Sequence, residues 1–227
     1  MLIIFDLDDT LIDTSGCITY FKLEDALNAM ILSGLAIPDF SEGLQLLRKI
    51  NASAESSRAA LSEFVDIHGF DKSFVEIGVK EIHETLPSDL PLFPLDGALE
   101  LLDSLGQQHQ LALVTVGIFS RQMEKLKKAG IDSRIFSKIF VSEEKGKLSH
   151  YQTIVDELGY SSSEVLVCGD RVPVDLRPAK ELGFKTVQML WGRGLNSNRT
   201  RGDVDYSISK LSELKDIVND LSFGFVL

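Results

Sequence analysis

The chain has 227 residues, of which 44% are hydrophobic and 25% are charged, a composition typical of folded globular proteins and not of disordered ones. This length suits one large domain, or a core domain that carries an insertion. With 34 acidic and 23 basic residues the formal net charge is -11, which argues against nucleic acid or an anionic membrane surface as the main partner.

The N-terminus and the two cysteines concern the cellular compartment. The chain begins MLIIFDLDDT, where aspartates interrupt the apolar run and no cationic segment precedes it, so we expect no secretory signal. No apolar stretch reaches the roughly 20 residues that span a bilayer. Cys17 and Cys168 lie in no metal-ligand spacing, and we interpret both as buried, small hydrophobic residues in a reducing compartment. The prediction is a cytoplasmic protein that acts without a membrane.

One predicted strand precedes a purely helical stretch. Residues 2–5 form a continuous apolar run, which is typical of a buried strand in a parallel sheet. Residues 15–92 contain no strand-like run, and Gly and Pro breaks divide them into about four helices. These helices are expected at 20–32, 40–49, 55–68 and 74–86. We therefore predict that residues 15–92 form an inserted, all-helical cap.

From about residue 93 the pattern alternates between short aliphatic runs and amphipathic segments. Helices are expected at 96–105, 121–128, 151–158 and 175–182, and strands at 111–116, 138–141, 165–168 and 186–190. This alternation predicts an α/β domain, a Rossmann-like, doubly wound parallel sheet formed by residues 1–14 and 93–227.

The strongest local signal is the pair of carboxylates that follows the first strand. Asp6 and Asp8 are placed at the carboxyl edge of the sheet, where open α/β folds bind ligands. Because like charges repel, such a pair requires a cation or a shared proton, which first suggests Mg2+. Taken alone, the pattern also fits a strand end followed by an acidic turn.

Three further signals follow later strands. Thr115 ends the strand 111–116 and, with Val116 and Gly117, offers a hydroxyl and backbone N–H groups to a phosphate oxygen, although a strand-end threonine is more often structural. Asp170 follows the strand 165–168, and Asp175 comes five residues later; a turn and a helix cap are the alternative interpretation. Lys145 and Lys147 precede a helix that Ser149 could cap.

In this order, these motifs resemble those of the haloacid dehalogenase-like phosphohydrolases. The similarity runs from Ile3 to about Tyr206: Asp6 to Thr10 resembles motif I, Thr115 motif II, Lys147 or Lys145 motif III, and Asp170 with Asp175 motif IV. The helical insertion resembles a C1-type cap. The spacing to Ser149 favours Lys147 as the motif III lysine, and a count back from Gly159 favours Lys145.

The resemblance implies a phosphatase mechanism. Asp6 would attack phosphorus to form an aspartyl-phosphate, and Asp8 would act as general acid and then as general base. Mg2+ would be bound by Asp6, the backbone carbonyl of Asp8, Asp170 and, directly or through water, Asp175. Thr115, an N–H group of Val116 or Gly117, and Lys147 would hold the transferring group.

Asp8 separates the alternatives within the family. Related dehalogenases generally lack this second aspartate, because a halide leaving group needs no proton, so its presence favours phosphoryl chemistry. A phosphomutase and a catalytically silent binding module remain the alternatives. The expected partner is a small phosphorylated metabolite and not nucleic acid; the particular metabolite and the oligomeric state are left open.

Two other groups of residues belong to this prediction. The basic residues of the insertion that could face a leaving group are Lys22, Arg48, Lys49 and Arg58. The loop 191–194, which follows the last predicted strand, is interpreted as a packed surface turn more readily than as part of the site.

Overall fold

The computed structural model describes residues 1–84, 90–142, 146–196 and 202–223. These residues divide into two compact units. The first unit combines Met1–Asp13 with Leu92–Leu227 and contains the sheet, and the second is Thr14–Pro91.

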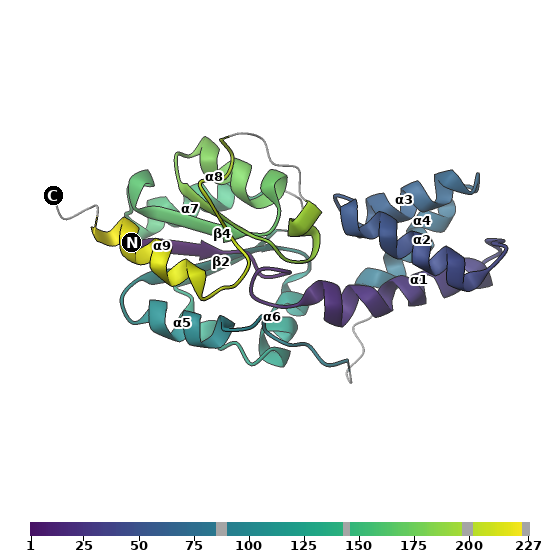
Figure 1. Ribbon diagram of the computed structural model, residues 1–227, viewed down its shortest axis with the longest axis horizontal. Helices are drawn as coiled ribbons and strands as arrows, with labels where there is room; N and C mark the ends of the chain where they lie inside the picture. Colours follow the sequence, from purple (N-terminus) through teal and green to yellow (C-terminus); the bar gives the residue numbers. More distant parts are fainter. Residues whose placement is uncertain (85–89, 143–145, 197–201, 224–227) are drawn as a thin grey trace. The chain divides into compact units, whose positions relative to one another are not determined.

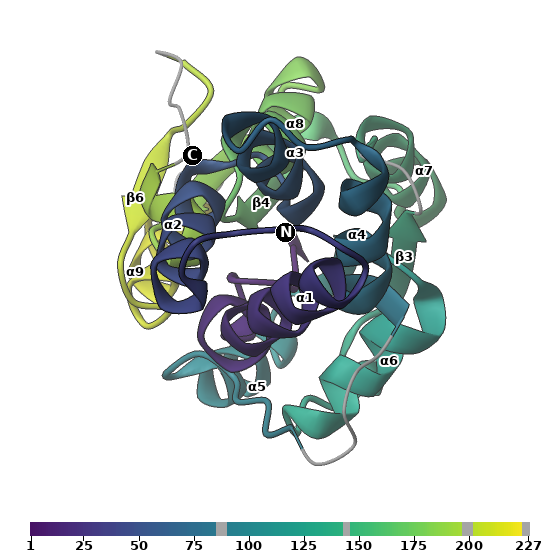
Figure 2. The same cartoon turned by 90° about the vertical axis from the view of Figure 1, so that its right-hand side faces the viewer.

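The first unit is built on a six-stranded sheet in which all neighbouring strands are parallel. The strands are β1 (Leu2–Phe5), β2 (Gln110–Val116), β3 (Lys138–Ser142), β4 (Val165–Gly169), β5 (Lys185–Met189) and β6 (Tyr206–Ile208). Their order is β3-β2-β1-β4-β5-β6, so that β3 and β6 form the two edges (Figure 2). The predicted doubly wound α/β fold is therefore confirmed.

Helices cover both faces of this sheet. They are α5 (Ala98–Gly106), α6 (Phe119–Lys128), α7 (Leu148–Leu158), α8 (Arg177–Glu181) and α9 (Glu213–Phe223). In Figure 1, α7 and α8 lie on one face, and α5 and α9 lie on the other. Because both faces are covered, the strands can consist almost entirely of apolar residues, as the sequence predicted.

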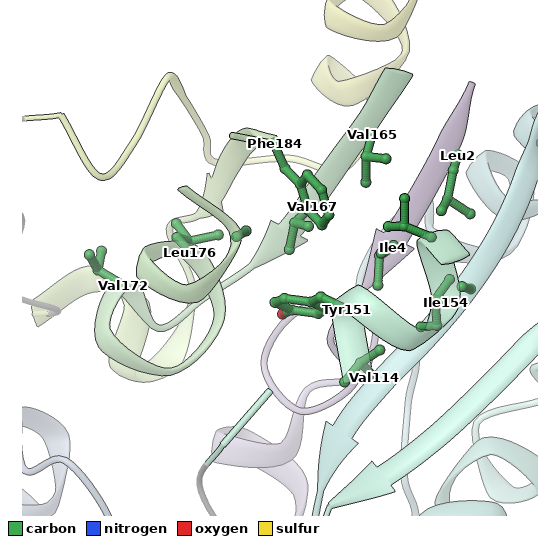
Figure 3. Packing of buried hydrophobic residues seen from close by; sticks show 13 residues of the cluster. Leu2, Ile4, Val114, Tyr151, Ile154, Val165, Val167, Val172, Leu176 and Phe184 are labelled. Atoms are coloured by element: carbon green, nitrogen blue, oxygen red, sulfur yellow. The ribbon is translucent and has the colours of Figure 1, made fainter. Parts of the chain in front are cut away.

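The central strand β1 is fully buried, and its side chains alternate between two apolar layers. Leu2 and Ile4 point to the layer beneath α7, where Ile4 lies beside Ala112 and Val167 on the neighbouring strands. Figure 3 shows Tyr151 of α7 packed into this cluster. Burying an aliphatic or aromatic side chain of this size contributes about 1.5–3 kcal/mol, so the cluster fixes the strand ends that carry the polar residues.

The strand order creates a topological switch point between β1 and β4. From β1 the chain continues to β2 and β3 on one side, whereas β4 leads to β5 and β6 on the other. Open α/β sheets bind ligands in the crevice where the connections diverge in this way, at the carboxyl ends of the strands. The ladder extends to this edge, because the Asp6 N–H donates to the Cys168 carbonyl over 2.9 Å.

The second unit contains four helices, α1 (Tyr20–Leu32), α2 (Phe40–Ser53), α3 (Ser57–Ile67) and α4 (Ser73–Glu84), which confirms the helical insertion (Figure 2). A π-helical segment, Ser15–Thr19, leads directly into α1. The Asp39 and Ser56 side chains cap α2 and α3 by accepting from the N–H groups of Glu42 and Ala59. Apolar faces of all four helices share one core, centred on residues such as Leu27 and Phe64.

The sequence did not predict β6 and α9. The strand β6 has three residues, of which only Ile208 is buried, so it lacks the apolar run of the other strands. In α9, Leu214 and Val218 are fully buried, one turn apart on the face that packs against the sheet unit. Cys17 and Cys168 are both buried, as expected, and neither forms a disulfide. No helix in the described part of the chain has the length and apolarity that crossing a bilayer requires.

Candidate active site

A buried lysine joins two of the predicted carboxylates at the carboxyl edge of the sheet. The Lys147 Nζ lies 2.6 Å from Asp6 Oδ1 and 2.6 Å from Asp175 Oδ1. Its side chain is 1% exposed, so both ion pairs are shielded from water. Lys147 precedes α7 as its N-cap residue, and the expected cap by Ser149 is wrong, because α7 begins at Leu148. The alternative, Lys145, lies outside the described residues.

For both Asp6 and Lys147, burial and the neighbouring opposite charges shift the pKa in opposite directions. Burial raises the pKa of Asp6 to about 7; the Lys147 ammonium opposes this shift, and the Asp175 and Asp8 carboxylates add to it. Burial alone would lower the pKa of Lys147, but the Asp175 and Asp6 carboxylates outweigh it, so that its pKa lies above the usual range. Lys147 is therefore a permanent cation in contact with Asp6.

Asp175 owes its place to the absence of a side chain on Gly169, the last residue of β4. A Cβ on Gly169 would lie 2.6 Å from Asp175 Cβ and 2.8 Å from its Cγ. Asp175 Oδ2 accepts the Arg171 N–H over 2.9 Å, while Oδ1 pairs with Lys147. In the structure this carboxylate thus bridges the loop after β4 and the lysine.

Three acidic residues form a group that could hold a metal ion. Asp6, Asp170 and Asp175 each offer one carboxylate oxygen, and these oxygens lie within 4.8 Å of one another. Asp170 Oδ1 is buried without a hydrogen-bond partner among the described residues. Burial raises the pKa of Asp170, and the Asp175 and Asp6 carboxylates raise it further, so the ionised form calls for a cation. A hard divalent cation such as Mg2+ fits this all-oxygen donor set.

The second carboxylate of the first motif, Asp8, lies beside α6. Lys125 Nζ of α6 is 2.7 Å from Asp8 Oδ1 and 2.9 Å from Oδ2. The amide of Gln122 donates to Asp8 Oδ2 over 3.0 Å. The next residue, Asp9, adopts φ 59°, which is uncommon outside glycine and marks the sharp turn after the carboxylate pair.

Thr115 at the end of β2 shares the Gln122 amide with Asp8. Its Oγ1 accepts from the Gln122 amide over 2.7 Å, and the Val116 carbonyl accepts from the same amide over 3.0 Å. The Gly117 N–H donates to the Ser142 carbonyl over 2.8 Å, so this N–H is already used within the sheet. Of the two amides expected to meet a phosphate, that of Gly117 is thus bound to the backbone.

Sequence reasoning missed Gln122 and Lys125, although both lie on the helix that directly follows Thr115. Their i, i+3 spacing places them on one helix face, and that spacing was the available signal. The loop 191–194 is also more than a surface turn: burial lowers the pKa of Arg193, the Arg171 cation lowers it further, and the carboxylates of Asp9, Asp170 and Asp8 oppose this shift. Gln188 fixes this loop by donating from Nε2 to the carbonyls of Gly194 and Asp170 over 3.1 and 3.3 Å.

Of the four basic residues considered in the helical unit, Lys49 is exposed, and the other three form ion pairs within that unit. Lys22 is buried and lies 2.9 Å from Asp25. Arg48 lies 3.2 Å from Glu24 and stacks on the Tyr20 ring. Arg58 pairs with Glu76. Lys22, Arg48 and Arg58 thus each have a carboxylate partner of their own.

The parallel sheet therefore carries paired carboxylates and a buried lysine at its switch point, where open α/β folds bind ligands. Residues 3–189 match the family described as haloacid dehalogenase-like hydrolase. Since the match spans most of the chain, this protein belongs to the haloacid dehalogenase-like hydrolases.

Individual relatives extend over nearly the whole chain. The chain is 32% identical over 228 residues to the glyceraldehyde 3-phosphate phosphatase of Methanocaldococcus jannaschii, covering 96% of this chain and 97% of that protein. Among solved structures, it is similar to the putative hydrolase YfnB from Bacillus subtilis bound to magnesium, with a TM-score of 0.65, 20% identity, and coverage of 96% and 98%. A predicted phosphoglycolate phosphatase from Haemophilus somnus gives a TM-score of 0.72 at 20% identity, with coverage of 95% and 96%.

Proposed function

We propose that this hydrolase is a Mg2+-dependent phosphatase that removes the phosphoryl group of a small phosphomonoester through an aspartyl-phosphate on Asp6. The observation that carries the proposal is the juxtaposition of Asp6, Lys147 and Asp170 at the switch point between β1 and β4. In this proposal Asp6 is the nucleophile, Lys147 a permanent cation and Asp170 a metal ligand, all at one buried edge of the sheet. A second carboxylate, Asp8, is available two residues after the nucleophile.

In the first step an Asp6 oxygen forms a bond to phosphorus while the bond from phosphorus to the leaving oxygen breaks. Asp6 Oδ1 is paired with Lys147, so the attacking carboxylate is held in one orientation. The leaving alkoxide takes a proton from the carboxyl group of Asp8. The Thr115 hydroxyl and Lys147 bind the non-bridging oxygens of the transferring phosphoryl group.

In the second step Asp8, now a carboxylate, removes a proton from water as the water oxygen attacks phosphorus. The bond between phosphorus and Asp6 breaks, and inorganic phosphate and the free Asp6 carboxylate result. Mg2+ held by Asp6, Asp170 and the Asp8 backbone carbonyl, with Asp175 in contact directly or through water, would supply compensation for the negative charge of the phosphoryl group.

The relatives guide the choice of substrate. Because the Methanocaldococcus jannaschii protein is a glyceraldehyde 3-phosphate phosphatase and matches this chain over nearly its full length, D-glyceraldehyde 3-phosphate is the first substrate to test. The assay measures phosphate release by the purified protein with Mg2+. Activity is expected to disappear with EDTA and in Asp6→Asn. Full activity of Asp6→Asn would refute the mechanism, and isomerisation of a sugar phosphate without phosphate release would establish a mutase instead.

A further inference from the structure

The Asp8 carboxylate is held by two side chains from a single face of α6. Lys125 contacts both Asp8 oxygens, over 2.7 and 2.9 Å, and Gln122 donates to Oδ2 over 3.0 Å. The Lys125 and Asp8 side chains are 16% and 29% exposed, so water screens their contact only in part. An aspartate side chain has two rotatable bonds, and these donors restrict both of them.

Gln122 also couples Asp8 to the predicted phosphate-binding threonine. Its Nε2 shares two hydrogens among Asp8 Oδ2, Thr115 Oγ1 and the Val116 carbonyl. Because Thr115 Oγ1 accepts from Gln122, the hydroxyl hydrogen of Thr115 is directed away from the amide. The Thr115 hydroxyl can therefore donate this hydrogen to a phosphate oxygen. Gln122 is 1% exposed, which fixes the amide in the space between the two residues.

From this geometry we infer that Lys125 and Gln122 are positioning residues that hold the acid/base carboxylate of Asp8 next to the phosphate-binding hydroxyl of Thr115. The inference rests on the proposed function. A proton donor must lie within hydrogen-bond reach of the leaving oxygen, and misplacement by about 1 Å can cost on the order of 10^2 in rate. Helix α6 thus sets the position of Asp8 relative to the phosphoryl group before substrate binds.

The test compares two leaving groups. The kcat/KM value reports the chemistry up to formation of the aspartyl-phosphate when that step is irreversible. The alkoxide of glyceraldehyde 3-phosphate needs a proton as it departs, whereas para-nitrophenolate leaves without one. Lys125→Met is therefore expected to lower kcat/KM for glyceraldehyde 3-phosphate by roughly 30- to 100-fold, and that for para-nitrophenyl phosphate by only about threefold. Gln122→Met should act in the same direction, and Lys125→Arg should recover most of the loss.

Two controls separate positioning from a structural effect. Lys127→Met removes the same charge from an exposed position on the same helix and should leave both substrates unaffected. In an Asp8→Asn background, Lys125→Met should cause no further loss, because Lys125 acts through Asp8. Equal losses for both substrates, or an additive loss in the double variant, would overturn the inference while the phosphatase activity of the wild type stands. A wild type that hydrolyses neither substrate would overturn the proposed function itself.

Discussion

The response of thermal stability to Mg2+ at two pH values probes the buried carboxylates at the ends of β1 and β4. Asp6 and Asp170 both have their pKa raised, first of all by burial, and that of Asp6 reaches about 7. An unfolded aspartate has a pKa of about 3.9. With the cation removed, the folded protein therefore binds more protons than the unfolded chain. Its stability should fall as the pH rises from about 4 towards 7.

Magnesium reverses this trend, because it binds the ionised carboxylates. At pH 5.5 a group with a pKa of about 7 is mostly protonated, so protons weaken cation binding at Asp6 by roughly 30-fold, or about 2 kcal/mol. At pH 8 this competition at Asp6 is negligible. For a chain of this size, 1 kcal/mol corresponds to about 2–4 °C in Tm. Saturating Mg2+ should thus raise Tm by about 4–8 °C more at pH 8 than at pH 5.5.

Differential scanning calorimetry with and without EDTA measures the effect. Asp170→Asn removes the ligand whose Oδ1 has no hydrogen-bond partner among the described residues, and it should abolish most of the Mg2+ response. Asp66→Asn, a change of equal charge at a side chain that is 53% exposed, serves as the control. A Mg2+ response that is equal at both pH values, or that persists in Asp170→Asn, would refute the assignment of these carboxylates to the metal.

Three further predictions concern single side chains. Lys147→Met leaves Asp6 and Asp175 without their shared cation and should lower the free energy of unfolding of the EDTA-treated protein, measured in urea, by about 3–5 kcal/mol. The control Lys138→Met removes an exposed ion pair with Glu157 and should lower it by at most about 1 kcal/mol. Gly169→Ala forces a Cβ against Asp175 and should lower stability by about 1–3 kcal/mol, while Gly146→Ala, with open space around it, should not; equal effects would contradict the packing argument. Asp8→Asn should lower kcat for glyceraldehyde 3-phosphate by about 10^2- to 10^4-fold with little change in KM, and a normal kcat in steady-state assays would exclude Asp8 as acid/base.

The parallel sheet was predictable because its strands are buried on both faces. The runs around Ile4, Leu113 and Val167 are continuous and apolar, and helical periodicity separates them. The strand β6 was not predictable, because an edge strand with one buried residue carries no such signal. Its pairing with β5 depends on a register that only the folded sheet defines.

For the candidate site, sequence patterns supplied the residues at strand ends and not their partners. Asp6 and Asp170 follow strands and Thr115 lies at the end of one, so their convergence on one edge was expected from topology. The contact of Lys125 with Asp8 joins residues 117 positions apart and depends on how α6 packs against the sheet. The i, i+3 spacing of Gln122 and Lys125 indicates a shared helix face but does not specify their distance from Asp8, which is why these residues were found only in the structure.

Trapping of the covalent intermediate tests the central claim most directly. The wild-type protein is mixed with glyceraldehyde 3-phosphate and Mg2+, quenched with acid during turnover, digested and analysed by mass spectrometry. The proposed mechanism predicts one added phosphoryl group on the N-terminal peptide, assigned to Asp6 by fragmentation, removed by hydroxylamine and absent in Asp6→Asn. The samples are quenched under conditions in which the dephosphorylation step limits turnover. The mechanism would be contradicted if the enzyme released phosphate under these conditions and no phosphorylated Asp6 were found.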